Sequence, residues 1–213
     1  SVSPCMANLQ QGLVAWYPFD GNASDMSGNG KHGTVNGATL SSDRFGQPNK
    51  AFSFDGLDDY INLNNASILG TTNNFSIFAW VNSGVGTIYG EFNAGNGSSR
   101  NYFRISGNYL GLDQYPPSGG VSSSIEILEL NQTNLWNQVG YVRTGSNWSF
   151  FVHGQLLNSG SNAENFSGSN PDLGYIGARA YTYGGYSGGV RDFFSGNLDD
   201  VRIYSRSLSG EEV

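Results

Sequence analysis

Hydrophobic positions along the chain fall in short runs, separated by turns rich in glycine, asparagine and aspartate. Residues 51–56 (AFSFDG) alternate with a period of two, and so do residues 60–63 (YINL) after a short acidic turn, which predicts a hairpin. Residues 75–81 (FSIFAWV) form a nearly continuous aromatic and β-branched run, which is typical of a central strand with both faces covered. Similar runs predict further strands at residues 12–20, 87–92, 102–105, 125–130, 136–143, 148–153, 174–176 and 200–204.

These short, regularly spaced strands predict an all-β protein, a two-sheet antiparallel β-sandwich or jelly roll. Thirty-one glycines and only 13% charged residues agree with many strands and turns. A helical start is expected only at residues 208–213, with Ser209 as N-cap. No internal repeat or low-complexity linker divides the chain. We therefore expect an N-terminal linker at residues 1–11 and a single domain at residues 12–213, excised from a larger polypeptide.

Charge and hydropathy exclude two classes of partner. The formal net charge of -7 and the pI of about 4.6 oppose binding to nucleic acid, whose phosphates require clustered lysine and arginine. The sequence contains no run of about 18 apolar residues, so no membrane-spanning helix is expected.

Four stretches together resemble a known family. They are residues 12–38 (with the loop DMSGNGKHG), 51–63 (AFSFDGLDDYINL), 135–160 (LWNQVGYVRTGSNWSFFVHGQLLNSG) and 196–213 (GNLDDVRIYSRSLSGEEV). In this order they resemble the laminin-G-like jelly-roll domains of the concanavalin A-like lectin and glucanase superfamily. The third stretch resembles a hairpin of that family, with His153 and Gly154 at the turn. The resemblance implies a concanavalin A-like sandwich. It also implies one of the uses of such domains, which are carbohydrate binding, adhesion and protein binding.

The resemblance also implies a structural Ca²⁺ ion. Asp20, Asn22 and Asp199 are the positions that match, and Asp25 and the carbonyls of residues 28–30 and 37 are weaker additions. Carboxylate, amide and carbonyl oxygens are the ligands that Ca²⁺ prefers, and the first and last strands of this fold are neighbours. The alternative is that the same residues form an Asx turn and a solvated strand edge.

Catalytic chemistry has little support in the sequence. Glu126 and Glu129 are three residues apart on a predicted strand, so their side chains point to opposite faces and cannot flank one glycosidic bond. His32 and His153 lack the surroundings of a nucleophile triad, and two histidines with the single Cys5 do not provide zinc-ligand spacing. We therefore expect a protein that is not an enzyme.

The segment 177–194 (GARAYTYGGYSGGVRDFF) is the strongest candidate for ligand binding. It is read as a loop, in which aromatic rings would stack on sugar C–H faces and guanidinium groups would donate to hydroxyls. The alternative is that its tyrosines pack against a sheet edge. Trp16, Trp80 and Trp136 fall inside apolar strand patterns and are expected in the core. The predicted ligand-binding residues are Arg179, Tyr181, Tyr183, Tyr186 and Arg191, with Tyr102, Arg104 and Tyr109 as secondary candidates.

Together these observations predict a non-catalytic carbohydrate-binding module, part of a secreted or cell-surface multidomain protein. We expect a monomer that binds a polysaccharide or glycan. The first alternative is an adhesion or protein-interaction module of the same fold, and a polysaccharide-active enzyme is less favoured. Whether the polymer is neutral or acidic stays open, because Arg100, Arg104, Arg179 and Arg191 could form a positive patch.

Overall fold

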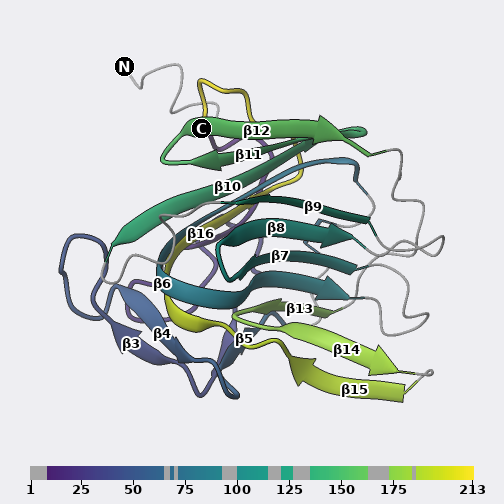
Figure 1. Ribbon diagram of the computed structural model, residues 1–213. Helices are drawn as coiled ribbons and strands as arrows, with labels where there is room; N and C mark the ends of the chain where they lie inside the picture. Colours follow the sequence, from purple (N-terminus) through teal and green to yellow (C-terminus); the bar gives the residue numbers. More distant parts are fainter. Residues whose placement is uncertain are drawn as a thin grey trace.

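The computed structural model describes residues 9–64, 68–69, 72–92, 100–114, 121–126, 135–162, 173–183 and 186–213. Within these ranges the chain forms antiparallel strands and turns without a helix, and the strands build two packed sheets (Figure 1). The predicted all-β sandwich is therefore confirmed. No described segment is a helix that could cross a membrane.

The two sheets share one long strand, β6 (Asn74–Phe92), which Figure 1 shows curving from one layer into the other. Sheet A contains its first half together with β1 (Leu13–Tyr17), β3 (Thr39–Ser41), β4 (Ala51–Asp55), β10 (Trp136–Thr144), β11 (Asn147–Val152), β12 (Gln155–Ser161) and β16 (Ser195–Tyr204). Sheet B contains its second half together with β2 (Thr34–Asn36), β5 (Tyr60–Asn62), β7 (Arg100–Ser106), β8 (Tyr109–Gln114), β9 (Val121–Glu126) and β13 (Leu173–Ile176). A hairpin of β14 (Arg179–Tyr183) and β15 (Tyr186–Arg191) follows β13.

The bend in β6 depends on glycine. A Cβ atom at Gly84 would lie 2.1 Å from Cζ of Phe194, and Gly86 has a φ of +116°, which side chains rarely allow. Phe194 is fully buried at this corner. The single strand can therefore turn from sheet A to sheet B while the Phe194 ring occupies the space beside Gly84.

The main core lies between the sheets and follows the alternation of the strands. On β6, Phe75, Ile77 and Ala79 point inward, whereas Phe78 and Trp80 point to the outer face of sheet A. A smaller apolar cluster covers part of that outer face. Its members come from five strands and from segments near both chain ends: Leu13, Phe78, Val142, Phe151, Tyr204 and Leu208, flanked by Leu9, Trp16 and Val213.

Two local predictions are confirmed and one is wrong. The run 75–81 forms a central strand paired on both sides, and β11 and β12 form a hairpin around His153 and Gly154, both with positive φ. Residues 51–63 do not form a hairpin, because β4 pairs with β3 and β16 in sheet A, whereas β5 pairs with β2 and β13 in sheet B. The acidic turn between them crosses from one sheet to the other.

The C-terminal helix and the buried tryptophans also differ from expectation. Residues 209–213 form one hydrogen-bonded turn, in which the carboxylate of Glu212 accepts the Ser209 N–H at 2.9 Å. Trp16, Trp80 and Trp136 are half-buried and are not part of the core between the sheets. Hydrophobic runs identify a covered strand, but they do not say how completely its outer face is covered.

Candidate functional site

A groove lies on the outer face of sheet B, where β6, β7 and β8 meet the β14–β15 hairpin. Strand alternation creates it. Phe103 and Ile105 of β7 point into the core, so Arg104 between them points outward. On the neighbouring β8, Leu110 and Leu112 are buried in the core, and Asp113 reaches the groove.

The hairpin docks on sheet B through a close backbone approach. A Cβ atom at Gly90 of β6 would lie 2.9 Å from the carbonyl oxygen of Ala178, so only glycine fits there. The hydroxyl of Tyr102 donates to the carbonyl of Ala180 at 3.5 Å, and the Arg179 guanidinium carbon lies 4.6 Å from the centroid of the Tyr102 ring. These contacts fix the position of Arg179 at the edge of the groove.

The two groove arginines are paired with carboxylates. Arg104 Nε lies 2.5 Å from Asp113 Oδ2, and its second contact to Asp113 Oδ1 measures 3.4 Å. Arg179 Nε donates to Asp192 Oδ2. Burial acts to lower the pKa of Arg179, but the hydrogen bond to Asp192 and the charges of Tyr102 and Asp192 raise the pKa overall. The groove therefore holds two positive and two negative side chains in direct pairs.

The hollow has a volume of about 560 Å³, within the roughly 300–1,000 Å³ of small-molecule sites. Residues of β6, the end of β7, the β7–β8 turn and the segment after β15 complete the lining: Val85, Gly86, Thr87, Ile105, Ser106, Gly107 and Phe193. Among the described residues, Thr87 Oγ1 is buried with no hydrogen-bond partner. The lining combines paired charges, a hydroxyl and apolar surface.

The structure brings several predicted ligand-binding residues to this groove. Arg104 and Arg179 line it. Tyr109, 49% exposed, pairs in register with Ser106 at its edge. Tyr102 is only 1% exposed beneath Arg179, so it can hold the arginine but cannot reach a ligand. Arg191 is opposite Arg179 in the hairpin.

Other predicted positions cannot be placed. The side chains of Tyr181, Tyr183 and Tyr186 are outside the described part of the chain, as are those of Arg100, Glu126 and Glu129. The segment that carries the three tyrosines is a paired hairpin and not the expected loop. Its many glycines concealed the strands, because they carry no hydrophobic period.

Sequence reasoning missed Asp113, Asp192 and Thr87. The signal for Asp113 is the alternation LGLDQ on β8, in which the aspartate falls on the face opposite the two leucines. Asp192 directly follows Arg191, whose Nε lies 4.0 Å from Asp192 Oδ2, but its closer partner is Arg179, thirteen residues away. No local pattern predicts that pair.

The residues expected to hold calcium have other partners. Asp20 forms an ion pair with Lys50 at 3.0 Å, and Asp199 Oδ2 lies 2.6 Å from an Arg44 nitrogen. Asn22 Oδ1 accepts the Ser24 N–H at 2.8 Å, which is an Asx turn. Asp20 and Asp199 do line one cleft, but a cation would have to displace Lys50 and Arg44 there. As placed, these residues do not fit Ca²⁺, and calcium binding stays an untested prediction.

The weaker calcium candidate, Asp25, is also fully engaged. Its Oδ1 accepts the Trp16 and Ser27 N–H groups at 3.0 and 2.8 Å. Its Oδ2 accepts the Lys31 N–H at 3.0 Å and the Ser27 hydroxyl at 2.9 Å. Burial acts to raise the pKa of Asp25, but these hydrogen bonds lower it overall. The carboxylate thus ties β1 to the following glycine-rich loop.

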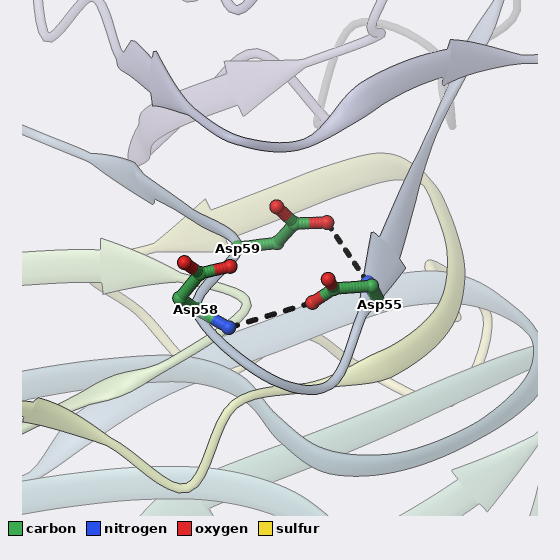
Figure 2. A group of neighbouring side chains, drawn as sticks. All are labelled: Asp55, Asp58 and Asp59. Atoms are coloured by element: carbon green, nitrogen blue, oxygen red, sulfur yellow. Dashed lines mark hydrogen bonds between the residues drawn. The ribbon is translucent and has the colours of Figure 1, made fainter.

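Three carboxylates, Asp55, Asp58 and Asp59, gather at the crossing turn between β4 and β5 (Figure 2). Their arrangement follows from turn formation. Asp55 Oδ1 accepts the Leu57 and Asp58 N–H groups, and Asp59 Oδ2 accepts the Asp55 N–H at 2.9 Å. The cluster is therefore explained by backbone capping.

Solved structures with the same architecture include sugar-binding domains. Domain 4 of AbnA, a GH43 extracellular arabinanase from Geobacillus stearothermophilus, in complex with arabinotriose, is 20% identical, with a TM-score of 0.69 over 94% of this chain and 95% of that one. The botulinum neurotoxin serotype D binding domain is 18% identical, with a TM-score of 0.66 over 98% of this chain and 51% of that one. The serotype D ligand binding domain in complex with N-acetylneuraminic acid is 15% identical, with a TM-score of 0.69 and the same coverage. The chain thus spans about half of the toxin domains.

At these identities the solved structures establish the fold alone. No curated protein sequence matches the chain. A family model does match, over residues 54–213, which is most of the chain. That match covers two of the four stretches in which the laminin-G-like resemblance was found, 135–160 and 196–213, and most of a third, 51–63. The chain therefore belongs to the concanavalin A-like lectin/glucanases superfamily.

Proposed function

We propose that this chain is a non-catalytic carbohydrate-binding module and that its ligand occupies the groove on sheet B. The observation that carries the proposal is the lining of the groove by two ion pairs, Arg104–Asp113 and Arg179–Asp192. Each pair presents hydrogen-bond donors and acceptors side by side and has no net charge. Sugar hydroxyls both donate and accept hydrogen bonds, so they match this surface.

Two of the fold neighbours support sugars as the ligand class. Domain 4 of the arabinanase was solved with arabinotriose, and the toxin domain with N-acetylneuraminic acid. The arabinanase is extracellular. By analogy we propose that this module acts at the cell surface or after secretion, as part of a longer protein. We also propose that it is monomeric.

The pairing in the groove also supports a binding role over a catalytic one. Glycoside hydrolysis needs one carboxyl group that donates a proton to the leaving oxygen and a second that attacks or activates water. Asp113 and Asp192 instead accept hydrogen bonds from guanidinium groups. We therefore propose that polysaccharides are bound and released unchanged, and no release of reducing sugar is expected.

A glycan array followed by calorimetric titration of the best oligosaccharide tests the proposal. Replacing Arg104 or Arg179 by alanine should weaken binding about tenfold or more, as for a central interface residue. Arg104→Lys should retain part of the affinity, because lysine keeps the charge but loses the bidentate geometry. Leu156→Ala, an exposed position on β12, is the matched control. Equal affinity in all variants would contradict the groove, and an array without hits would favour the protein-interaction alternative.

A further inference from the structure

A second polar cleft lies on the outer face of sheet A, on the opposite side of the sandwich from the groove. We call it the outer cleft. It is lined by Trp16, Asp20, Arg44, Phe45, Asp199 and Asp200, among others, and has a volume of about 320 Å³. A neighbouring hollow of about 280 Å³ around Trp80 shares Arg44, Asp200 and Arg202 with it.

A bulge in β16 gives the cleft its two central carboxylates. The pairing of β16 with β6 shifts register between Asp199 and Arg202, and Asp200 has a φ of +49°. Side chains on a regular strand alternate between faces, but both consecutive aspartates here meet the same guanidinium. Arg44 lies 2.6 Å from Asp199 Oδ2 and 3.7 Å from Asp200 Oδ2. Bulges and positive φ at residues other than glycine concentrate next to binding sites.

Aromatic rings frame these charges. The indole N–H of Trp16 donates to Asp200 Oδ1 at 2.7 Å, and the same carboxylate accepts two hydrogen bonds from Arg202 at 3.0 and 3.1 Å. The Arg44 guanidinium carbon lies 4.8 Å from the Trp80 ring centroid and 4.7 Å from that of Phe45. Each polar group in the centre of the cleft is thus held by at least one neighbour.

Phe45 is displayed at the rim. The residue is 70% exposed, although a large apolar side chain normally gains free energy by burial. The turn that carries it is held by Asp43 Oδ1, which accepts the N–H groups of Phe45 and Gln47 at 2.9 and 2.7 Å. An ordered turn therefore presents an aromatic face beside the charged centre of the cleft.

The charge pattern limits what this cleft can bind. Arg44 pairs with Asp199, Arg202 with Asp200 and Lys50 with Asp20. The carboxylates would repel an anionic ligand, and the guanidinium groups would repel a metal cation. A neutral molecule with several hydroxyls can instead donate to each carboxylate and accept from each cation, while its C–H face stacks on an aromatic ring.

We propose that the outer cleft is a second binding site, which takes one or two units of a neutral saccharide. Its volume is at the small end of the roughly 300–1,000 Å³ of ligand pockets, which limits the bound portion to a short segment. The site shares no lining residue with the groove and stands independently of it. Two sites on opposite faces would let one module contact two glycan chains.

The test is a titration of the ¹⁵N-labelled full chain with arabinotriose, galactotriose and maltotriose, followed by NMR. The chain has four tryptophans, and the indole N–H of Trp16 reports directly on the cleft. At least one trisaccharide should shift this signal. Phe45→Ala should weaken that response about tenfold, and it should leave the fold intact because the ring is mostly exposed. Arg104→Ala in the groove and Leu156→Ala on β12 should leave the Trp16 response unchanged.

Three results would overturn the second site. They are the absence of a Trp16 response to all three sugars, a response that Arg104→Ala abolishes, and a response to calcium chloride alone. A Trp16 response that persists while Arg104→Ala changes no other signal would support the outer cleft and refute the groove instead. The two proposals therefore fail separately.

Discussion

The carboxylate of Asp25 offers a direct test of how the N-terminal part of the fold is held together. It is 4% exposed and accepts four hydrogen bonds, from the N–H groups of Trp16, Ser27 and Lys31 and from the Ser27 hydroxyl. In Asp25→Asn one oxygen stays and the other becomes an NH₂ group. If that NH₂ group faces the Lys31 N–H, two hydrogen-bond donors oppose each other. The remaining hydrogen bonds are weaker, because their acceptor is no longer a charged carboxylate.

The magnitude follows from the bonds that change. A hydrogen bond to a charged group contributes about 1.5–3 kcal/mol, and an unsatisfied buried donor costs about 1–3 kcal/mol. With partial relaxation we expect a loss of about 3 kcal/mol in the free energy of unfolding. For a chain of this size that corresponds to a fall in Tm of about 6–12 °C. Urea denaturation followed by circular dichroism gives the free energy, and calorimetry gives Tm.

The pH dependence supplies a second readout. The pKa of Asp25 is lowered on folding, so the stability that it contributes is present above the unfolded value of about 4 and is lost as the pH falls through the folded value. The difference between wild type and Asp25→Asn should therefore narrow below about pH 4. Asp20→Asn is the control, because its carboxylate is exposed and forms one surface ion pair, worth at most about 1 kcal/mol. Equal stability of the two variants at pH 7 would refute the anchoring role.

Three further predictions follow from single contacts. Gly90→Ala should push the hairpin away from sheet B, because the new Cβ would lie 2.9 Å from the Ala178 carbonyl oxygen. Calorimetry should then show weaker ligand binding in the groove and a lower Tm. An unchanged affinity would mean that the position of the hairpin does not matter for binding. The hydrogen bond from Arg206 lowers the pKa of Glu212 to about 2. The Tm difference between wild type and Glu212→Gln should therefore be largest at neutral pH and vanish towards pH 2. A Tm difference that does not depend on pH would contradict this pairing. Because Lys50 and Arg44 form ion pairs with the predicted calcium ligands, added calcium or EDTA should change Tm by less than about 1 °C. If calcium does bind, a 100-fold excess over its Kd would raise the free energy of unfolding by about 2.7 kcal/mol and Tm by several degrees, which would contradict this prediction.

Local patterns were sufficient to identify the fold class and the central strand. A nearly continuous run of aromatic and β-branched residues is typical of a strand that is covered on both faces, so the run 75–81 could be recognised as a central strand without knowing its neighbours. The hairpin at His153 and Gly154 was expected from the family resemblance, and its two consecutive positive φ angles suit a tight turn. In each case the determining interactions are close together in the sequence.

Those local patterns could not predict which strands pair with one another. The runs 51–56 and 60–63 look like a hairpin, yet they join different sheets, because each strand pairs with a segment that is distant along the chain, such as β16 for β4. Whether a strand's outer face is covered is likewise a long-range matter. Trp16 and Trp80 are half-buried, and the described residues near the chain ends, such as Leu9 and Leu208, cover only part of the outer face of sheet A.

For the candidate sites, the sequence by itself determined which chemical groups are available: arginines 104 and 179 on strand-rich, glycine-rich segments, and acidic residues near both chain ends. Only the tertiary structure decided their electrostatic state. The expected positive patch is neutralised at Arg104 by a residue on the neighbouring strand and at Arg179 by Asp192, and the expected calcium ligands are occupied by Lys50 and Arg44. The physical reason is that charge interactions at physiological salt are screened beyond about 8–10 Å, so a side chain's charge partners are those that the sheets bring within that distance. Many of these partners are distant in the sequence, and a residue's sequence neighbours do not reveal them.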